Sequence, residues 1–121
     1  MKLQPDRILG QTVTGHGNGW LGLDGERFHQ NMLIAWNGLR QEWKGNLDNL
    51  SSSADFIDLL NVQPEVLLIG CGKQKIVIPM NHLIPFFQQN IGVESMDTAA
   101  ACRTYNILAA ENRKVAAILF V

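Results

Sequence analysis

The fold of the second half of the chain is decided by residues 96–106, which run Met96-Asp97-Thr98-Ala99-Ala100-Ala101-Cys102-Arg103-Thr104-Tyr105-Asn106. An aspartate before a run of alanines is a strong signal for the start of a helix. We therefore expect a strand to end near Met96 and a helix to run from about Thr98 to Asn112. Arg103 lies early in this helix, where the positive end of the helix dipole mildly disfavours a cation. That position suggests that Arg103 serves something other than helix stability.

The rest of the second half alternates between apolar strands and helices. A continuously apolar run predicts a central strand at residues 66–69, and further strands are expected at residues 93–96 and 115–120. Helices are expected at about residues 54–60 and 81–90. Strand–helix–strand order with short links predicts parallel strands joined by right-handed crossovers.

Three smaller predictions concern the segments around these elements. Residues 51–53 are three serines, which offer caps for the helix that follows. Pro85 is awkward within its helix but is tolerable if it lies in the first turn. Residues 76–78 are expected to add a brief extended segment.

The first half is rich in glycine and turn signals, and it is expected to be mostly β-structure. Asp24-Gly25 is a strong two-residue hairpin signal between residues 20–23 and 26–28. Residues 32–36 suit a buried strand, and residues 41–43 are expected to return beside it. The three tryptophans are expected to pack in the core and the hairpin rather than to form a base-stacking platform.

Composition and charge narrow the classes of function. The chain has 121 residues, 46% of them hydrophobic and 17% charged, as expected of one ordinary soluble domain over residues 1–121. A net charge of −1 argues against nucleic-acid binding driven by bulk charge. No apolar run approaches the roughly 20 residues that span a bilayer. Residues 1–7 lack the apolar segment of a signal peptide. We therefore expect a cytoplasmic protein without membrane insertion.

The cysteine and histidine residues do not indicate a metal or cofactor site. Cys71 and Cys102 make no disulfide framework and are expected to be reduced thiols. The helix dipole and Arg103 could lower the pKa of Cys102, although buried inert thiols are commoner. His82 and Cys71 form no zinc pattern. We therefore predict neither a cofactor nor a bound metal.

Residues 17–22 match the pattern G-x-G-x-x-G. A dinucleotide-binding fingerprint needs a strand before this pattern and a helix that opens within it. A hairpin follows here instead. We therefore interpret these glycines as residues for tight turns and close backbone approach.

A candidate site follows from the predicted sheet. Gly70-Cys71-Gly72-Lys73 leaves the carboxyl end of a buried strand, where ligands collect in open α/β sheets. Asp97 and Thr98 would lie beside this loop if the two strands are parallel. Backbone N–H groups there can hold an anion, unless Asp97 as the helix cap already occupies them. A tight exit turn is the simpler interpretation of the glycines.

The helix that follows adds a polar face to this candidate site. Arg103 and Asn106 are three residues apart and share that face. Arg103 could bind a carboxylate or phosphate that Asn106 orients, while Tyr105 points about a quarter turn away. The competing interpretation is that Arg103 and Asn106 face water and Tyr105 packs normally. The candidate ligand-binding residues are Gly70, Gly72, Asp97, Thr98, Arg103, Tyr105 and Asn106.

Four segments of the chain resemble the signature of a known family, at residues 64–72, 92–98, 101–108 and 111–116. That family is small and largely uncharacterised, and it includes a mitochondrial respiratory complex I assembly factor and an adipogenesis-associated protein. The resemblance implies an α/β fold of three layers, with a central mixed, mostly parallel sheet flanked by helices and an N-terminal β-hairpin extension. It also implies that Arg103, Tyr105 and Asn106 lie by a cavity. Many relatives are expected to have threonine at the position of Cys71, which counts against Cys71 as a required nucleophile.

Two hypotheses from different classes follow. The favoured one is a protein-interaction or assembly-factor-like module, whose polar helix face and hairpin recognise a protein partner. The alternative is a small-anion binder or enzyme acting in the cleft between residues 70–72 and 97–106. Arg103→Ala should weaken partner capture in the first case and should abolish ligand-induced thermal stabilisation in the second.

Overall fold

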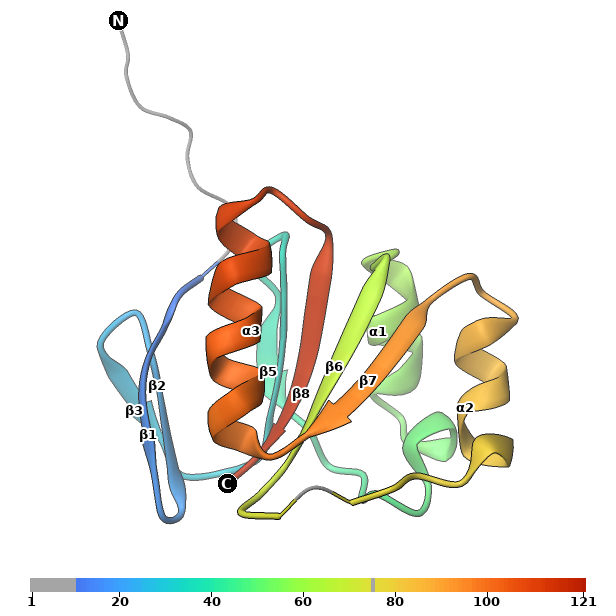
Figure 1. Ribbon diagram of the computed structural model, residues 1–121, viewed down its shortest axis with the longest axis horizontal. Coiled ribbons are helices and arrows are strands. Elements are labelled where there is room, and N and C mark those ends of the chain that lie inside the picture. The colour runs from blue at the N-terminus through green and yellow to red at the C-terminus, as the bar shows by residue number, and fades with distance from the viewer. Residues whose placement is uncertain (1–10, 75) are drawn as a thin grey trace, which may run out of the picture.

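A mixed five-stranded sheet forms the centre of the computed structural model, which describes residues 11–74 and 76–121 (Figure 1). The strand order is β5-β4-β8-β6-β7. These strands are β4 (Met32–Ala35), β5 (Arg40–Glu42), β6 (Val66–Cys71), β7 (Gly92–Met96) and β8 (Val115–Phe120). β6 pairs in parallel with both β7 and β8, as predicted, whereas β4 runs antiparallel to β8 and β5. The expectation about a signal peptide in residues 1–7 falls outside the described residues.

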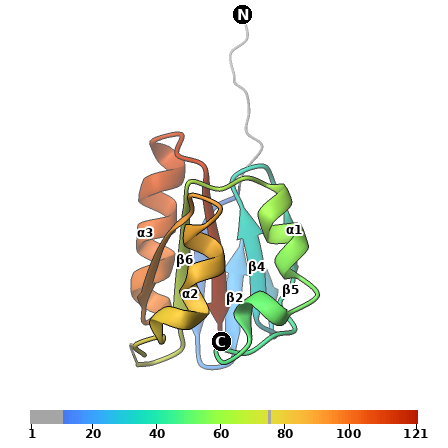
Figure 2. The same cartoon turned by 90° about the vertical axis from the view of Figure 1, so that its right-hand side faces the viewer.

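Two further layers cover the faces of this sheet. On one face lie α1 (Phe56–Asn61), α2 (Met80–Phe87) and the 3₁₀ turn η1 (Leu50–Ser52). On the other face lie α3 (Thr98–Ala110) and a small antiparallel sheet of β1 (Val13–Gly17), β2 (Trp20–Leu23) and β3 (Glu26–Phe28). Figure 2 shows α1 and α3 on opposite sides of the central sheet. The predicted three-layer α/β fold with an N-terminal hairpin is confirmed.

The core is divided by the alternation of side chains along the central strands. In β8, Ala116 and Ile118 pack toward α1 and α2, whereas Ala117 and Leu119 pack toward α3 and the small sheet. All four are fully buried. A strand covered on both faces needs apolar residues at every position, which explains the continuous apolar runs in the sequence.

The strongest local signals produced the expected structure. Asp24 and Gly25 form the turn between β2 and β3, with φ of 51° and 88° respectively. Asp97 caps α3, because its Oδ1 accepts a hydrogen bond of 2.7 Å from the N–H of Ala100. Both signals depend on residues adjacent in sequence, so distant packing does not override them.

Two predicted boundaries around β6 are corrected. β6 continues to Cys71, so Gly70 lies within the strand rather than ending it. Gly70 pairs with Met96 on one side and Leu119 on the other, and these pairings keep it in the sheet. Residues 76–78 form no strand, since β7 already occupies the place beside β6.

Two predictions about helix ends are also corrected. Pro85 lies in the second turn of α2, not the first. The helix continues past it because Phe86 is fully buried and anchors the last turn. α1 has no serine cap; two of the three serines belong to η1, and Ser53 Oγ instead accepts a hydrogen bond from the N–H of Asp55.

Candidate functional site

Thr98 joins three elements at the carboxyl edge of the parallel strands. Its N–H donates to the carbonyl of Gly72 at 2.8 Å, and its Oγ1 accepts from the N–H of Gly72 at 2.9 Å. The same hydroxyl donates to the carbonyl of Phe120 at 2.6 Å. The loop after β6 and the start of α3 are therefore in direct contact, and both the N–H and the O–H of Thr98 are engaged, so Thr98 has no free donor for an anion in this arrangement.

The two glycines of the candidate site serve different structural needs. A Cβ on Gly70 would lie 3.0 Å from Cα and Oγ1 of Thr98, so a glycine is what lets α3 approach β6 this closely. Gly72 has a φ of +86° and open space around it, so it serves the turn. Gly72 therefore fits the simpler interpretation of a tight exit turn, whereas Gly70 is explained by packing within the strand.

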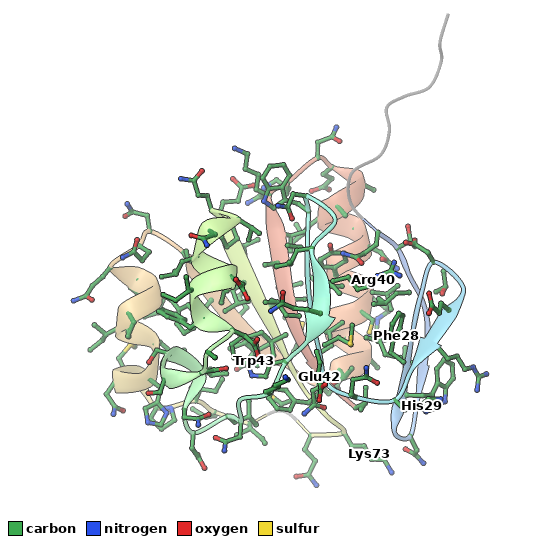
Figure 3. The ribbon with its side chains drawn as sticks, turned by 180° about the vertical axis from the view of Figure 1, so that it is seen from behind. Phe28, His29, Arg40, Glu42, Trp43 and Lys73 are labelled. Carbon is green, nitrogen blue, oxygen red and sulfur yellow. The ribbon has the colours of Figure 1, made fainter. Side chains whose placement is uncertain are left out.

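A cleft of about 740 Å³ opens beside this junction. Its lining comes from four places: the end of β1 with the turn to β2 (residues 16–19), Gly72 and Lys73, the start of α3 (residues 97–99), and Phe120 with Val121. Lys73 extends from its loop at this end of the molecule (Figure 3). Two of the first three N–H groups of α3 are already taken, by the Gly72 carbonyl and the Asp97 carboxylate. Lys73 is therefore the main feature that favours an anion.

The polar face of α3 lies away from this cleft. Asn106 binds the backbone of Val13, accepting from its N–H and donating to its carbonyl at 2.9 Å each. Arg103 is exposed. Neither residue lines the cleft, and Tyr105 does not line it either. The structure thus brings together Gly72, Asp97 and Thr98 in the cleft lining, places Gly70 against Thr98 behind it, and separates these residues from Arg103, Tyr105 and Asn106.

Tyr105 is fully buried between α3 and the small sheet. Among the described residues its hydroxyl has no partner in hydrogen-bond geometry. Burial raises the pKa of Tyr105 to about 12; the nearby Gln11 side chain opposes this shift and the Asp24 carboxylate adds to it. Such a phenol stays neutral at physiological pH, so the ring acts as a core residue.

Arg40 connects the central sheet to the small sheet near Tyr105. Its Nη2 lies 2.7 Å from the carboxylate of Asp24, and its Nε donates to Oε1 of Gln11 at 2.8 Å. Figure 3 shows Arg40 and Phe28 between β5 and the small sheet. This polar cluster was not anticipated from the sequence, because its members are distant along the chain.

Cys102 is a packing residue rather than an activated nucleophile. Burial raises the pKa of its thiol to about 11, and the opposing effect of Arg103 is smaller. Cys71 packs on the opposite face of the sheet. Within residues 11–74 and 76–121, no group of three or more His, Cys, Asp or Glu side chains is placed to hold a metal ion.

A second surface, on α2, was missed by the sequence analysis. Met80, Ile84 and Phe87 stand exposed along one side of the helix, and Ile76 and Val77 are exposed in the segment just before it. We call these five residues the α2 apolar face. α2 lies at the β7 end of the molecule, across the sheet from α3 (Figures 1 and 2). The available signal was the absence of Asp, Glu, Lys and Arg from residues 76–93.

This fold is that of a Mth938-like α/β domain, the description given to a solution structure from Bordetella pertussis. That structure has a TM-score of 0.73 and 29% identity, with 99% of this chain and 92% of that one covered. The family model described as "Protein of unknown function (DUF498/DUF598)" matches residues 13–120. The chain belongs to this family, and the resemblance found in the sequence is confirmed.

Two named proteins are similar to this chain in sequence. A "13 kDa major membrane protein" of Francisella tularensis subsp. holarctica is 33% identical over 97 residues, covering 78% of this chain and 77% of the relative. The NADH dehydrogenase [ubiquinone] 1 alpha subcomplex assembly factor 3 of Xenopus tropicalis is 36% identical over 74 residues, covering 61% of this chain but only 38% of the relative.

Two crystal structures show the same fold. A protein from Bordetella parapertussis has a TM-score of 0.79 and 34% identity, with 96% of this chain and 98% of that chain covered. An outer membrane protein from Bartonella henselae has a TM-score of 0.77 and 26% identity, with 95% and 98% covered. In the described part of this chain, the helices are too short or too polar to cross a membrane.

Proposed function

We propose that this protein is an interaction module of the assembly-factor kind, which binds a protein partner through the α2 apolar face. The observation that carries the proposal is the exposure of that face. Val77 is 82% exposed, Met80 64% and Ile84 44%. Large contiguous apolar patches on a folded surface mark interaction sites. The relationship to an assembly factor supports the same class of function.

The side of α2 that faces the core is apolar, as is the side that faces the solvent. Phe86 is fully buried and Leu83 packs against the core, so the inner side is apolar too. A surface helix normally turns polar or charged side chains, rather than large apolar ones, toward the solvent. The core covers α2 on one side only, and a protein partner would cover the other side.

The contact surface therefore differs from the polar helix face favoured by the sequence. Both polar atoms of the Asn106 side chain are committed to Val13. Arg103 alone offers a single exposed charge, and one exposed charge contributes little to binding. The α2 apolar face offers far more surface whose burial would stabilise a complex.

Quantitative affinity capture tests this proposal. The immobilised full chain is compared with Ile84→Glu and with the control Ile107→Glu, since Ile107 is 59% exposed on α3, across the central sheet. We expect a specific protein to be retained by the wild type and the control and to be lost from Ile84→Glu. Equal retention by all three folded proteins would contradict the proposal. Circular dichroism and the melting temperature confirm folding.

A second candidate is a small-anion binder or enzyme acting in the cleft. The specific observation in its favour is the cleft of about 740 Å³ with Lys73 on its rim. Phosphates, nucleotides and carboxylates are screened by thermal shift against the wild type, Lys73→Ala and the control Lys44→Ala. A stabilising anion whose effect disappears only in Lys73→Ala supports this candidate. A broad screen without a stabilising anion counts against it.

A further inference from the structure

The exposed apolar residues of α2 form a single ridge. Met80, Ile84 and Phe87 occupy positions i, i+4 and i+7 of the helix, so their side chains follow one line along its surface. This is the spacing of the seam residues through which two helices pack side by side. The shape of the α2 apolar face is therefore that of half of a helix–helix contact.

We propose that the partner element which covers this face is an amphipathic α-helix of another protein, lying along α2 with an uncharged apolar side. The inference rests on the proposed function, because it takes the α2 apolar face as the protein-binding surface and adds what binds there.

The lack of charged residues around α2 determines what kind of partner helix can bind there. Residues 76–93 contain no Asp, Glu, Lys or Arg. The exposed polar neighbours on and just after α2 are the amides of Asn81, Gln88, Gln89 and Asn90. A partner charge placed at the centre of this contact would lose its water without gaining a counter-ion, which is costly. The centre of the partner face must therefore be apolar and uncharged.

Two other kinds of occupant fit the same region less well. A partner strand would have to pair with the edge strand β7, which carries the exposed Glu94 at its centre. Charged side chains on edge strands oppose the addition of a further strand. A lipid surface would favour several Lys or Arg residues around the apolar side; residues 76–93 supply none, and Lys73 and Lys75 just before them are the nearest in sequence.

The length of α2 sets the size of the contact. Its eight residues span about 12 Å at the usual rise of 1.5 Å per residue, or roughly two turns. A contact of two turns is smaller than the roughly 800 Å² per partner of a standard stable interface. The isolated helix–helix contact is therefore expected to be weak, with a dissociation constant on the order of micromolar or higher.

Two synthetic peptides of about 12 residues test the proposal, a length at which an isolated helix is marginal. The patterned peptide carries Leu and Ile at heptad a and d positions, Ala and Gln elsewhere, and Lys only at its ends. The scrambled peptide has the same composition without an apolar side. Each is titrated into the ¹⁵N-labelled full chain, and amide shifts are followed.

The proposal predicts shifts confined to residues around α2, with the patterned peptide only, and a gain of peptide helicity on binding. Ile84→Glu should abolish these shifts and Ile107→Glu should leave them unchanged. The helical occupant is overturned by an absence of shifts, by equal binding of the scrambled peptide, or by shifts that lie elsewhere.

Two controls test the other possible occupants of the face, a second copy of this chain and a lipid surface. Sedimentation equilibrium of the full chain that shows a dimer lost in Ile84→Glu would assign the face to a second copy and overturn the proposal. Ile84-dependent binding to phosphatidylcholine–phosphatidylglycerol vesicles would assign it to lipid and overturn it as well. If the peptides fail while affinity capture still depends on Ile84, the helical occupant falls and the interaction module stands. If capture fails too, both fall.

Discussion

The side-chain amide of Asn106 pairs with the backbone of Val13, from which it is separated by 93 positions in the sequence. Its Oδ1 accepts from the Val13 N–H and its Nδ2 donates to the Val13 carbonyl, at 2.9 Å each. This is the two-bond pattern by which residues of antiparallel strands pair. α3 thus uses one side chain to hold the free edge of β1, and the small sheet is fixed to the helix layer.

Asn106→Ala should therefore destabilise the protein. Removing the amide leaves the N–H and carbonyl of a residue that is only 6% exposed without partners, at a cost of about 1–3 kcal/mol. Arg103→Ala, one turn earlier on an exposed side chain, should change the free energy of unfolding by less than about 0.5 kcal/mol. Urea denaturation of both variants makes the comparison, and equal effects would refute the structural role of Asn106.

Asparagine in place of alanine should lower stability at position 70 and raise it at position 72. Gly70→Ala places a Cβ 3.0 Å from Thr98 and should cost about 1–3 kcal/mol, and Gly70→Asn should cost more. Gly72→Ala is strained by a φ of +86° at about 1–2 kcal/mol. Gly72→Asn should cost less, because asparagine tolerates this conformation. Thermal melts of the four variants decide the point; a Gly70→Asn variant more stable than Gly70→Ala would be incompatible with this packing.

Tyr105 should make stability fall at high pH. Burial raises its pKa from 10 to about 12, so the folded state keeps the proton longer than the unfolded state does. Its contribution is fully present below pH 10 and is lost as pH rises toward 12, by up to about 1.4 kcal/mol per pH unit. Tyr105→Phe should flatten this part of the pH profile. It should not destabilise the protein at neutral pH, since the hydroxyl it removes has no partner among the described residues.

The ionisation of Tyr105 can be followed directly, because it is the only tyrosine in the chain. Ultraviolet absorbance of tyrosinate should show a midpoint well above 10 in the folded protein and near 10 in urea. A native midpoint near 10 would show that the phenol is not buried as described.

Cys102 should resist alkylation in the folded protein. Burial raises its pKa to about 11, so only about one thiol in a thousand is ionised at pH 8. Iodoacetamide should therefore modify Cys102 slowly in a Cys71→Ser background and rapidly after unfolding. Mass spectrometry gives the rates, and native labelling as fast as that of the unfolded chain would indicate an activated thiol instead.

Much of the fold could be predicted because its signals are local. The Asp24-Gly25 turn, the Asp97 cap and the three parallel strands depend on residues that are adjacent or nearly so. The course of Gly70 through the strand was missed, because it depends on pairing with Met96 and Leu119 from other elements.

The site was less predictable, because its surfaces depend on long-range packing. Asn106 binds the backbone of Val13, and nothing near Asn106 in the sequence indicates this partner. The β1–β2 turn reaches the cleft only through the placement of the small sheet. Apolar residues on both sides of α2 suit a buried helix, and only the fold shows which side stays exposed.

Site-specific photo-crosslinking from position 84 tests the central claim most directly. A benzophenone side chain is placed at Ile84 in one protein and at Ile107 in a matched control, and each is irradiated in extract. We predict a discrete protein adduct from position 84, competed by unlabelled wild type and not by unlabelled Ile84→Glu, and no such adduct from position 107. The absence of an adduct at position 84, or the same adduct from both positions, would contradict a protein-binding role for the α2 apolar face.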